Sequence, residues 1–86
     1  MWPSWFHPEL ARMSPVERAV AVTKMIAAAH GITINDILGP SRERRIYRVR
    51  CEVALYLRRR GKSYSQIGRF MNRHYSSVIQ MVREAA

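Results

Sequence analysis

The chain has very little cysteine and no long apolar run. Its single cysteine, Cys51, excludes an internal disulfide and favours a reducing, intracellular compartment. No stretch approaches the roughly 18 apolar residues that a membrane-spanning helix needs. The start of the chain, MWPSWFHPEL, lacks the basic and apolar regions of a secretory signal. We therefore expect a cytoplasmic protein without a membrane partner.

Acidic residues are also few. Six Asp and Glu oppose fifteen Lys and Arg, and the excess is confined to the second half of the chain. Residues 1–40 carry three residues of each sign, whereas residues 41–86 carry twelve cations against three glutamates. Most of these cations are arginines, which fork onto phosphate oxygens and guanine edges. This distribution predicts a polyanionic partner, nucleic acid being the commonest, and a basic surface that merely aids solubility is the alternative.

The sequence offers no catalytic or metal-binding set. Its three histidines lack metal-ligand spacing, and its one cysteine has no partner. A phosphate-binding G-x-x-x-x-G-K-[ST] motif is also missing, because its first glycine would fall on Tyr56. A chain of 86 residues has room for one modest core only. We predict a protein that is not an enzyme and that uses no cofactor, metal or small-molecule substrate.

Helix signals follow one another through most of the chain, and no strand pattern occurs. Capping residues such as Ser14 with Glu17, and Ser63 with Gln66, mark helix starts. The expected helices span about 15–30, 34–38, 43–60, 64–71 and 74–84. The first of them should bury the stripe Val16, Ala19, Val20, Thr23, Ile26, Ala27 and His30. We predict an all-α protein, with an aromatic leader at residues 1–13 and one small bundle of about five helices at residues 14–86.

The last two predicted helices are joined by a tight turn at Asn72-Arg73, because Asn tolerates a positive φ. Helix, tight turn and helix in a small basic all-α chain is the arrangement of a helix-turn-helix DNA reader. In that arrangement the first residues of the second helix point at base edges. These positions hold His74, Tyr75, Ser76 and Ser77. As alternatives, the serines are solvated first-turn residues and Tyr75 covers the core.

Arginines crowd the start of the helix at 43–60, where the helix dipole disfavours cations. They are Arg42, Arg44, Arg45, Arg48 and Arg50. This local penalty indicates an external anion. Arg58, Arg59 and Arg60 lie in the last turn, where the dipole favours them, so a purely structural interpretation is stronger there.

Residues 26–86 resemble the C-terminal DNA-binding domain of DnaA, the bacterial replication initiator. The matching motifs are GITINDILG, SRERRI, ALYL, SYSQIGRFM and NRHYSSV, the last similar to the family's Gly-Arg-Asp-His-Thr-Thr-Val signature. The resemblance implies a Trp-repressor-like helical fold that binds duplex DNA, and we expect this chain to act as a stand-alone protein. It also implies that a basic loop enters the minor groove and that the signature helix reads the major groove.

Two sets of candidate DNA-contacting residues follow. The recognition set is Arg73, His74, Tyr75, Ser76, Ser77 and Gln80. The basic-loop and phosphate set is Arg42, Arg44, Arg45, Arg48, Lys62, Ser63, Tyr64 and Ser65. His74-Tyr75 replaces the family's Asp-His pair, and two serines replace its threonines. We expect these departures to change the base preference while the docking mode stays similar.

The predicted function is sequence-specific binding of double-stranded DNA by a small bacterial or phage transcriptional regulator, or by a replication-linked factor, associated with the nucleoid. The alternative is a protein-interaction module that docks on RNA polymerase or an initiator through Trp2, Trp5 and Phe6. The same leader could support a homodimer. RNA binding is a third reading, weakened because the chain lacks the aromatic platforms of most RNA-binding modules.

Overall fold

A computed structural model describes residues 13–86, and their regular structure is entirely α-helical. The helices are α1 (Pro15–Ala29), α2 (Ile34–Leu38), α3 (Arg44–Arg59), α4 (Tyr64–Met71) and α5 (Tyr75–Ala85). Each boundary lies within one residue of its predicted position, so the predicted all-α bundle of five helices is confirmed. None of the helices in this part of the chain is both long and apolar enough to cross a membrane.

The starts of α1, α2 and α4 are fixed by reciprocal capping boxes. In each, the N-cap side chain accepts a hydrogen bond from the third helical residue, whose side chain accepts one in return. The pairs are Ser14 with Glu17, Thr33 with Asp36, and Ser63 with Gln66. By contrast, Glu43 makes no side-chain cap for α3, and the first turn of α3 holds no acidic residue. The positive end of α3 therefore faces its arginines without compensation from its own first turn.

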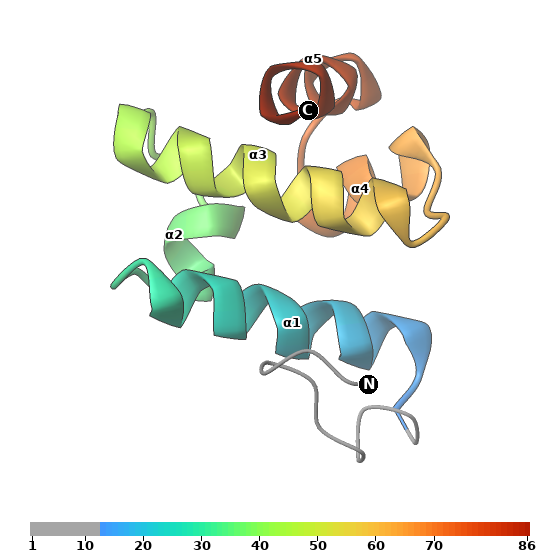
Figure 1. The fold of residues 1–86 in the computed structure, drawn as a ribbon, viewed down its shortest axis with the longest axis horizontal. Helices are drawn as coiled ribbons and strands as arrows, with labels where there is room; N and C mark the ends of the chain where they lie inside the picture. The colour runs from blue at the N-terminus through green and yellow to red at the C-terminus, as the bar shows by residue number, and fades with distance from the viewer. Residues whose placement is uncertain (1–12) are drawn as a thin grey trace.

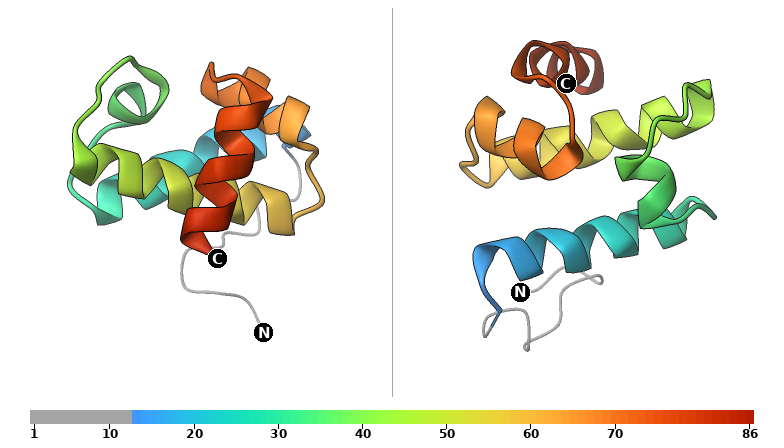
Figure 2. Two further views of the ribbon diagram at one scale, coloured as in Figure 1. Left: turned by 90° about the horizontal axis from the view of Figure 1, so that it is seen from above. Right: turned by 180° about the vertical axis from the view of Figure 1, so that it is seen from behind.

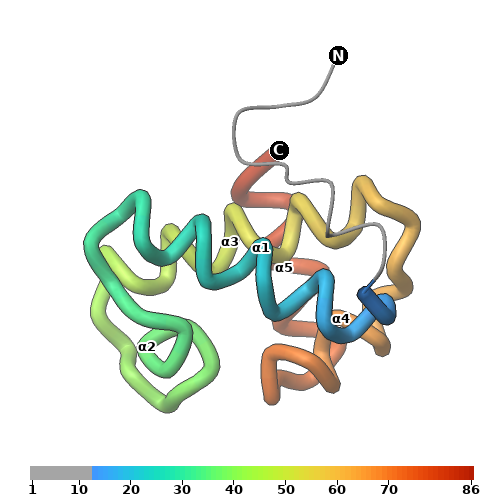
Figure 3. Tube along the Cα trace, turned by 90° about the horizontal axis from the view of Figure 1, so that it is seen from below, coloured from blue at the N-terminus to red at the C-terminus, as the bar shows by residue number. Residues whose placement is uncertain are grey.

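The central element is α3, which packs against all four other helices. It lies between α1 on one side and α5 on the other, while α2 and α4 pack near its two ends (Figures 1 and 3). The core cluster draws residues from every helix. It includes Ala27, Ile37, Val49, Val53, Ala54, Leu57, Ile67, Met71, Val78 and Met81. This packing holds the short α4 and the start of α5 on a rigid support.

The predicted apolar stripe of α1 is only partly correct. Thr23 and Ala27 are buried as predicted, but Val16 is 67% exposed. Val22, which the stripe omitted, is buried instead. The neighbours of α1 are α2 and α3, and they leave its first turn on the surface. The helical spacing of apolar residues predicts the apolar face of α1, but it does not predict how much of that face the other helices cover.

Candidate nucleic-acid interface

Helices α4 and α5 form a helix-turn-helix through the three residues Asn72, Arg73 and His74. Asn72 adopts the left-handed conformation, with φ 57° and ψ 45°. The backbone N–H groups of Asn72 and Arg73 both donate to the carbonyl of Gly68, the latter at 2.8 Å. Asn reaches this conformation more easily than most non-glycine residues. The predicted tight turn is thus confirmed, and it reverses the chain directly in front of α5.

Close packing of α4 on this turn depends on Gly68. A Cβ atom at this position would lie 2.6 Å from the carbonyl oxygen of Arg73 and 3.4 Å from the backbone nitrogen of Tyr75. Gly68 is buried, and no side chain fits between the two segments. The candidate residues did not include Gly68, although a glycine inside a helical pattern often marks such a close contact. It sets the angle at which the start of α5 leaves the turn.

His74 is the N-cap residue of α5. Its Nδ1 atom accepts a hydrogen bond from the Ser76 backbone N–H at 3.2 Å and lies 2.8 Å from the Ser76 hydroxyl oxygen. A ring nitrogen that accepts from a backbone N–H carries no proton, so the neutral ring carries its proton on Nε2. The predicted base reader therefore also caps its own helix. Its Nε2–H remains a donor that can reach a partner.

The other recognition residues lie on the surface of α5. Tyr75 is 51% exposed, with its ring centroid 4.5 Å from that of His74, so it does not cover the core. Ser76 and Ser77 are exposed beside it. Gln80 is exposed one turn further along, where its side-chain amide donates to Glu84 at 3.3 Å. The structure thus brings four polar side chains together on the first turn of the second helix of the motif.

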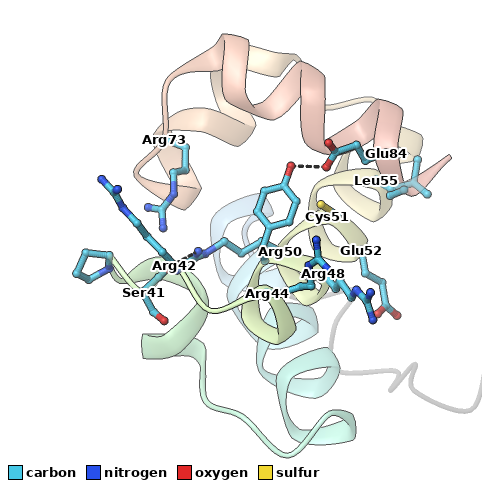
Figure 4. Close-up of a pocket in the computed structure, with 13 residues that line it drawn as sticks. Ser41, Arg42, Arg44, Arg48, Arg50, Cys51, Glu52, Leu55, Arg73 and Glu84 are labelled. Carbon is cyan, nitrogen blue, oxygen red and sulfur yellow. Dashed lines mark hydrogen bonds between the residues drawn. The ribbon is translucent and has the colours of Figure 1, made fainter.

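Three of the predicted basic-loop arginines line one open groove. Arg42, Arg44 and Arg48 are exposed around a hollow of about 1020 Å³ between α3, the loop before it and the end of α5 (Figure 4). Two glutamates also line this groove, and both are engaged. Glu84 accepts a hydrogen bond from the Tyr47 hydroxyl, which raises the tyrosine pKa, and Glu52 pairs with His30, the residue that follows α1. The groove therefore presents mainly cationic groups to a partner.

Arg45 lies apart from these three. Its guanidinium donates to the backbone carbonyls of His30 at 3.0 Å and Gly31 at 3.4 Å. These carbonyls end α1, where a helix leaves acceptors without intrahelical partners. Arg45 is thus bound to the end of α1 and does not line the groove.

Arg50 corrects the prediction that every arginine at the start of α3 awaits an external anion. Its side chain is only 4% exposed. The guanidinium donates four hydrogen bonds of 2.6 to 2.9 Å, all to backbone carbonyls. The acceptors are Asp36, Ile37, Gly39 and Ser41. Carbonyls at the end of α2 and in the following loop therefore satisfy this cation inside the protein.

Arg73, predicted as a recognition residue, is partly buried against the α2–α3 loop. Its guanidinium donates to the carbonyls of Met71 at 3.3 Å and Asn72 at 3.1 Å, and also to that of Gly39. These contacts join the helix-turn-helix to the loop that carries Arg42. Figure 2 shows the loop and the start of α5 on the same side of the molecule.

The remaining phosphate candidates lie at the start of α4. Ser63 and Ser65 are exposed there, and Ser63 also caps the helix. The Arg58 guanidinium lies 4.4 Å from the centroid of the Tyr64 ring and donates to the Lys62 carbonyl at 3.1 Å. The length of α3, 16 residues or about 24 Å, separates this group from the arginines at the other end of that helix.

The predicted docking residues Trp2, Trp5 and Phe6 lie outside residues 13–86, which are the part of the chain that the structure describes. The structure therefore leaves the proposed leader and its partner as predictions.

Residues 20–84 match the family model described as the bacterial DnaA protein helix-turn-helix. The match covers most of the chain and includes both helices of the motif and the loop before α3. Comparison with curated proteins and with solved structures gave no significant match.

Proposed function

Because the chain belongs to the family of bacterial DnaA helix-turn-helix domains, which implies DNA binding, we propose that it binds duplex DNA sequence-specifically. The first turn of α5 enters the major groove, and the α2–α3 loop reaches the minor groove. The observation that carries this proposal is the polar group at the start of α5. His74, Tyr75, Ser76 and Ser77 are all exposed on the one turn that Gly68 and Asn72 hold in place.

These side chains suit base edges in the major groove. Serine hydroxyls donate or accept, and the Nε2–H of His74 donates to an acceptor such as guanine O6 or N7. The Tyr75 ring offers an apolar face to a thymine methyl group, and its hydroxyl can reach a phosphate. The first turn of α5 therefore supplies the base discrimination.

Arginine–phosphate contacts supply most of the affinity. Arg42, Arg44 and Arg48 are exposed on one groove, in a chain with a net charge of +9. Each phosphate that they neutralise releases condensed counterions, so affinity falls steeply as salt rises. Phosphate contacts position the protein on the duplex without selecting its sequence.

We expect substitutions in these two groups to separate specificity from affinity. Tyr75→Ala or Ser76→Ala should reduce discrimination at one or two base pairs by about 1–3 kcal/mol each. Arg42→Ala or Arg44→Ala should weaken binding to every duplex alike and lower the salt slope by about one. Fluorescence anisotropy with a selected duplex and its single-base variants, at several salt concentrations, measures both effects. A uniform loss of affinity for all four variants on every duplex would overturn the recognition assignment.

In the cell, we propose a regulator of transcription or a replication-linked factor associated with the bacterial nucleoid, or its phage counterpart. Immunoprecipitation of the bound DNA separates the two roles. Enrichment at promoters supports a transcriptional role, whereas enrichment at a replication origin supports a role in replication.

A further inference from the structure

The carbonyl oxygen of Gly39 accepts hydrogen bonds from two arginines of different elements. Arg50 Nη2, from α3, donates to it at 2.8 Å, and Arg73 Nη2, from the helix-turn-helix, donates to the same oxygen. A carbonyl oxygen has two lone pairs, so both bonds can form at once. Gly39 ends α2 and begins the loop that carries Arg42. One backbone atom thus joins that loop to the turn in front of α5.

Arg50 fixes the loop from the inside. Its Nε donates to Ile37 at 2.7 Å, and its Nη1 donates to Ser41 at 2.6 Å, so one guanidinium holds carbonyls on both sides of Gly39. Position 39 also has no room for a side chain, because a Cβ atom there would lie 2.7 Å from the Asn35 carbonyl oxygen. These bonds attach the start of the loop to α3.

Arg73 fixes the loop from the side of the helix-turn-helix. Its Nη1 donates to Met71 and Asn72, within the turn, while its Nη2 donates to Gly39. The two Nη atoms of an arginine are fixed in one plane, so they can bind the turn and the loop at the same time and hold them at a fixed distance. The single ammonium of a lysine cannot reproduce this geometry. The two cations lie close together, because both donate to the same oxygen. Burial and, to a lesser extent, the Arg73 charge therefore lower the pKa of Arg50. An anionic partner beside them would relieve this repulsion.

We propose that Arg73 and Arg50 are positioning residues that lock the α2–α3 loop to the helix-turn-helix, so that both reach DNA as one unit with a fixed separation. This inference rests on the proposed function, because the separation matters only where both elements contact one duplex. Preorganisation lowers the cost of ordering the loop during binding. It also makes the spacing between loop-contacted and α5-contacted base pairs part of the recognised sequence. Arg73 thus acts through the loop rather than by reading a base.

The lock itself is tested in the free protein by amide hydrogen exchange. Two backbone amides at the loop donate hydrogen bonds, Gly39 to the Asn35 carbonyl at 2.8 Å and Glu43 to the Ser41 hydroxyl at 3.4 Å. Arg73→Ala should speed the exchange of these amides by about tenfold or more, because the loop opens locally. Arg73→Lys, which keeps the charge, should do the same. Arg69→Ala, at an exposed arginine of α4, is the matched control and should leave these amides unchanged. Protection of the Val53 amide reports that each variant remains folded. Unchanged exchange at the loop in a folded Arg73→Lys variant would overturn the proposal.

The consequence for DNA is tested with a duplex enriched from a random pool and a copy that carries one extra base pair between the loop-contacted and α5-contacted parts. For the unmodified protein, the insertion should cost at least as much as a mismatched pair, about 5- to 150-fold in affinity. For Arg73→Lys this penalty should shrink to within about threefold, because the released loop adapts. If Arg73 were a simple phosphate contact, Arg73→Ala would lower the salt slope by about one, and both Arg73 variants would keep the full insertion penalty, which would overturn the lock. If no duplex is enriched, the proposed function fails, and the exchange experiment still decides whether the loop is locked.

Discussion

Replacing Arg50 by methionine is expected to lower the free energy of unfolding by about 3–5 kcal/mol. The substitution removes the guanidinium but keeps an unbranched side chain about as long as the arginine stem, so the apolar contacts of the stem remain. Four backbone carbonyls lose a donor at a residue that is 4% exposed, although the Gly39 carbonyl keeps its bond from Arg73. Each buried polar group left without a partner costs about 1–3 kcal/mol, and local rearrangement recovers part of the total. For a small domain, this loss is a large fraction of the whole stability.

Urea unfolding followed by circular dichroism measures this loss, and Arg48→Met is the matched control. Arg48 lies two residues earlier on the same helix but is exposed, so its replacement should change stability by less than about 0.5 kcal/mol. Equal stability of the two variants would show that the carbonyls around Arg50 find water instead, and that the buried guanidinium does not hold the loop.

Gly68→Ala is expected to destabilise the protein by about 1–3 kcal/mol and to abolish specific DNA binding. Its Cβ atom would lie 2.6 Å from the carbonyl oxygen of Arg73, so α4 and the turn must separate. That movement changes the angle at which α5 leaves the turn and displaces the recognition residues together. A misplacement of this kind affects every base contact at once, whereas Tyr75→Ala removes only one side chain.

The sign of the stability change tests the close contact at Gly68. Helix propensity alone predicts that alanine in place of glycine inside α4 stabilises the protein by about 1 kcal/mol. Steric contact with the turn predicts the opposite sign. Urea unfolding distinguishes the two, and Arg69→Ala on the neighbouring exposed position controls for the general effect of alanine in α4. A more stable Gly68→Ala variant with intact DNA binding would contradict the geometry of the helix-turn-helix described above.

The helices could be predicted from the sequence because their boundaries depend on local chemistry. Ser14 and Ser63 cap α1 and α4 through bonds to residues three positions away, and the turn at Asn72 needs only a residue that tolerates positive φ. The exposed group at the start of α5 followed in the same way. The first residues of a helix that follows a tight turn lie at the edge of the helix pair, where few neighbours cover them.

The roles of Arg45 and Arg73 could not be predicted, because their partners are backbone carbonyls far away in the sequence. Arg45 contacts the end of α1, and Arg73 contacts Gly39, which precedes it by 34 residues. The buried position of Arg50, by contrast, is indicated by the sequence. Arg50 follows Ile46 by four residues and precedes Val53 by three, so helical period places it on the buried face of α3. An arginine on a core stripe indicates internal acceptors, and that position outweighs its membership in a basic cluster.

The central claim is that the first turn of α5 reads a specific DNA sequence, and selection from a random duplex pool tests it most directly. The selection is run at two salt concentrations with the unmodified protein and with the Tyr75→Ala variant. We predict that the unmodified protein enriches one motif at both concentrations, with weaker total binding at higher salt. The variant should lose one or two positions of that motif and keep the rest. Binding that falls with salt but enriches no motif at either concentration would show a non-specific polyanion binder and would contradict the claim.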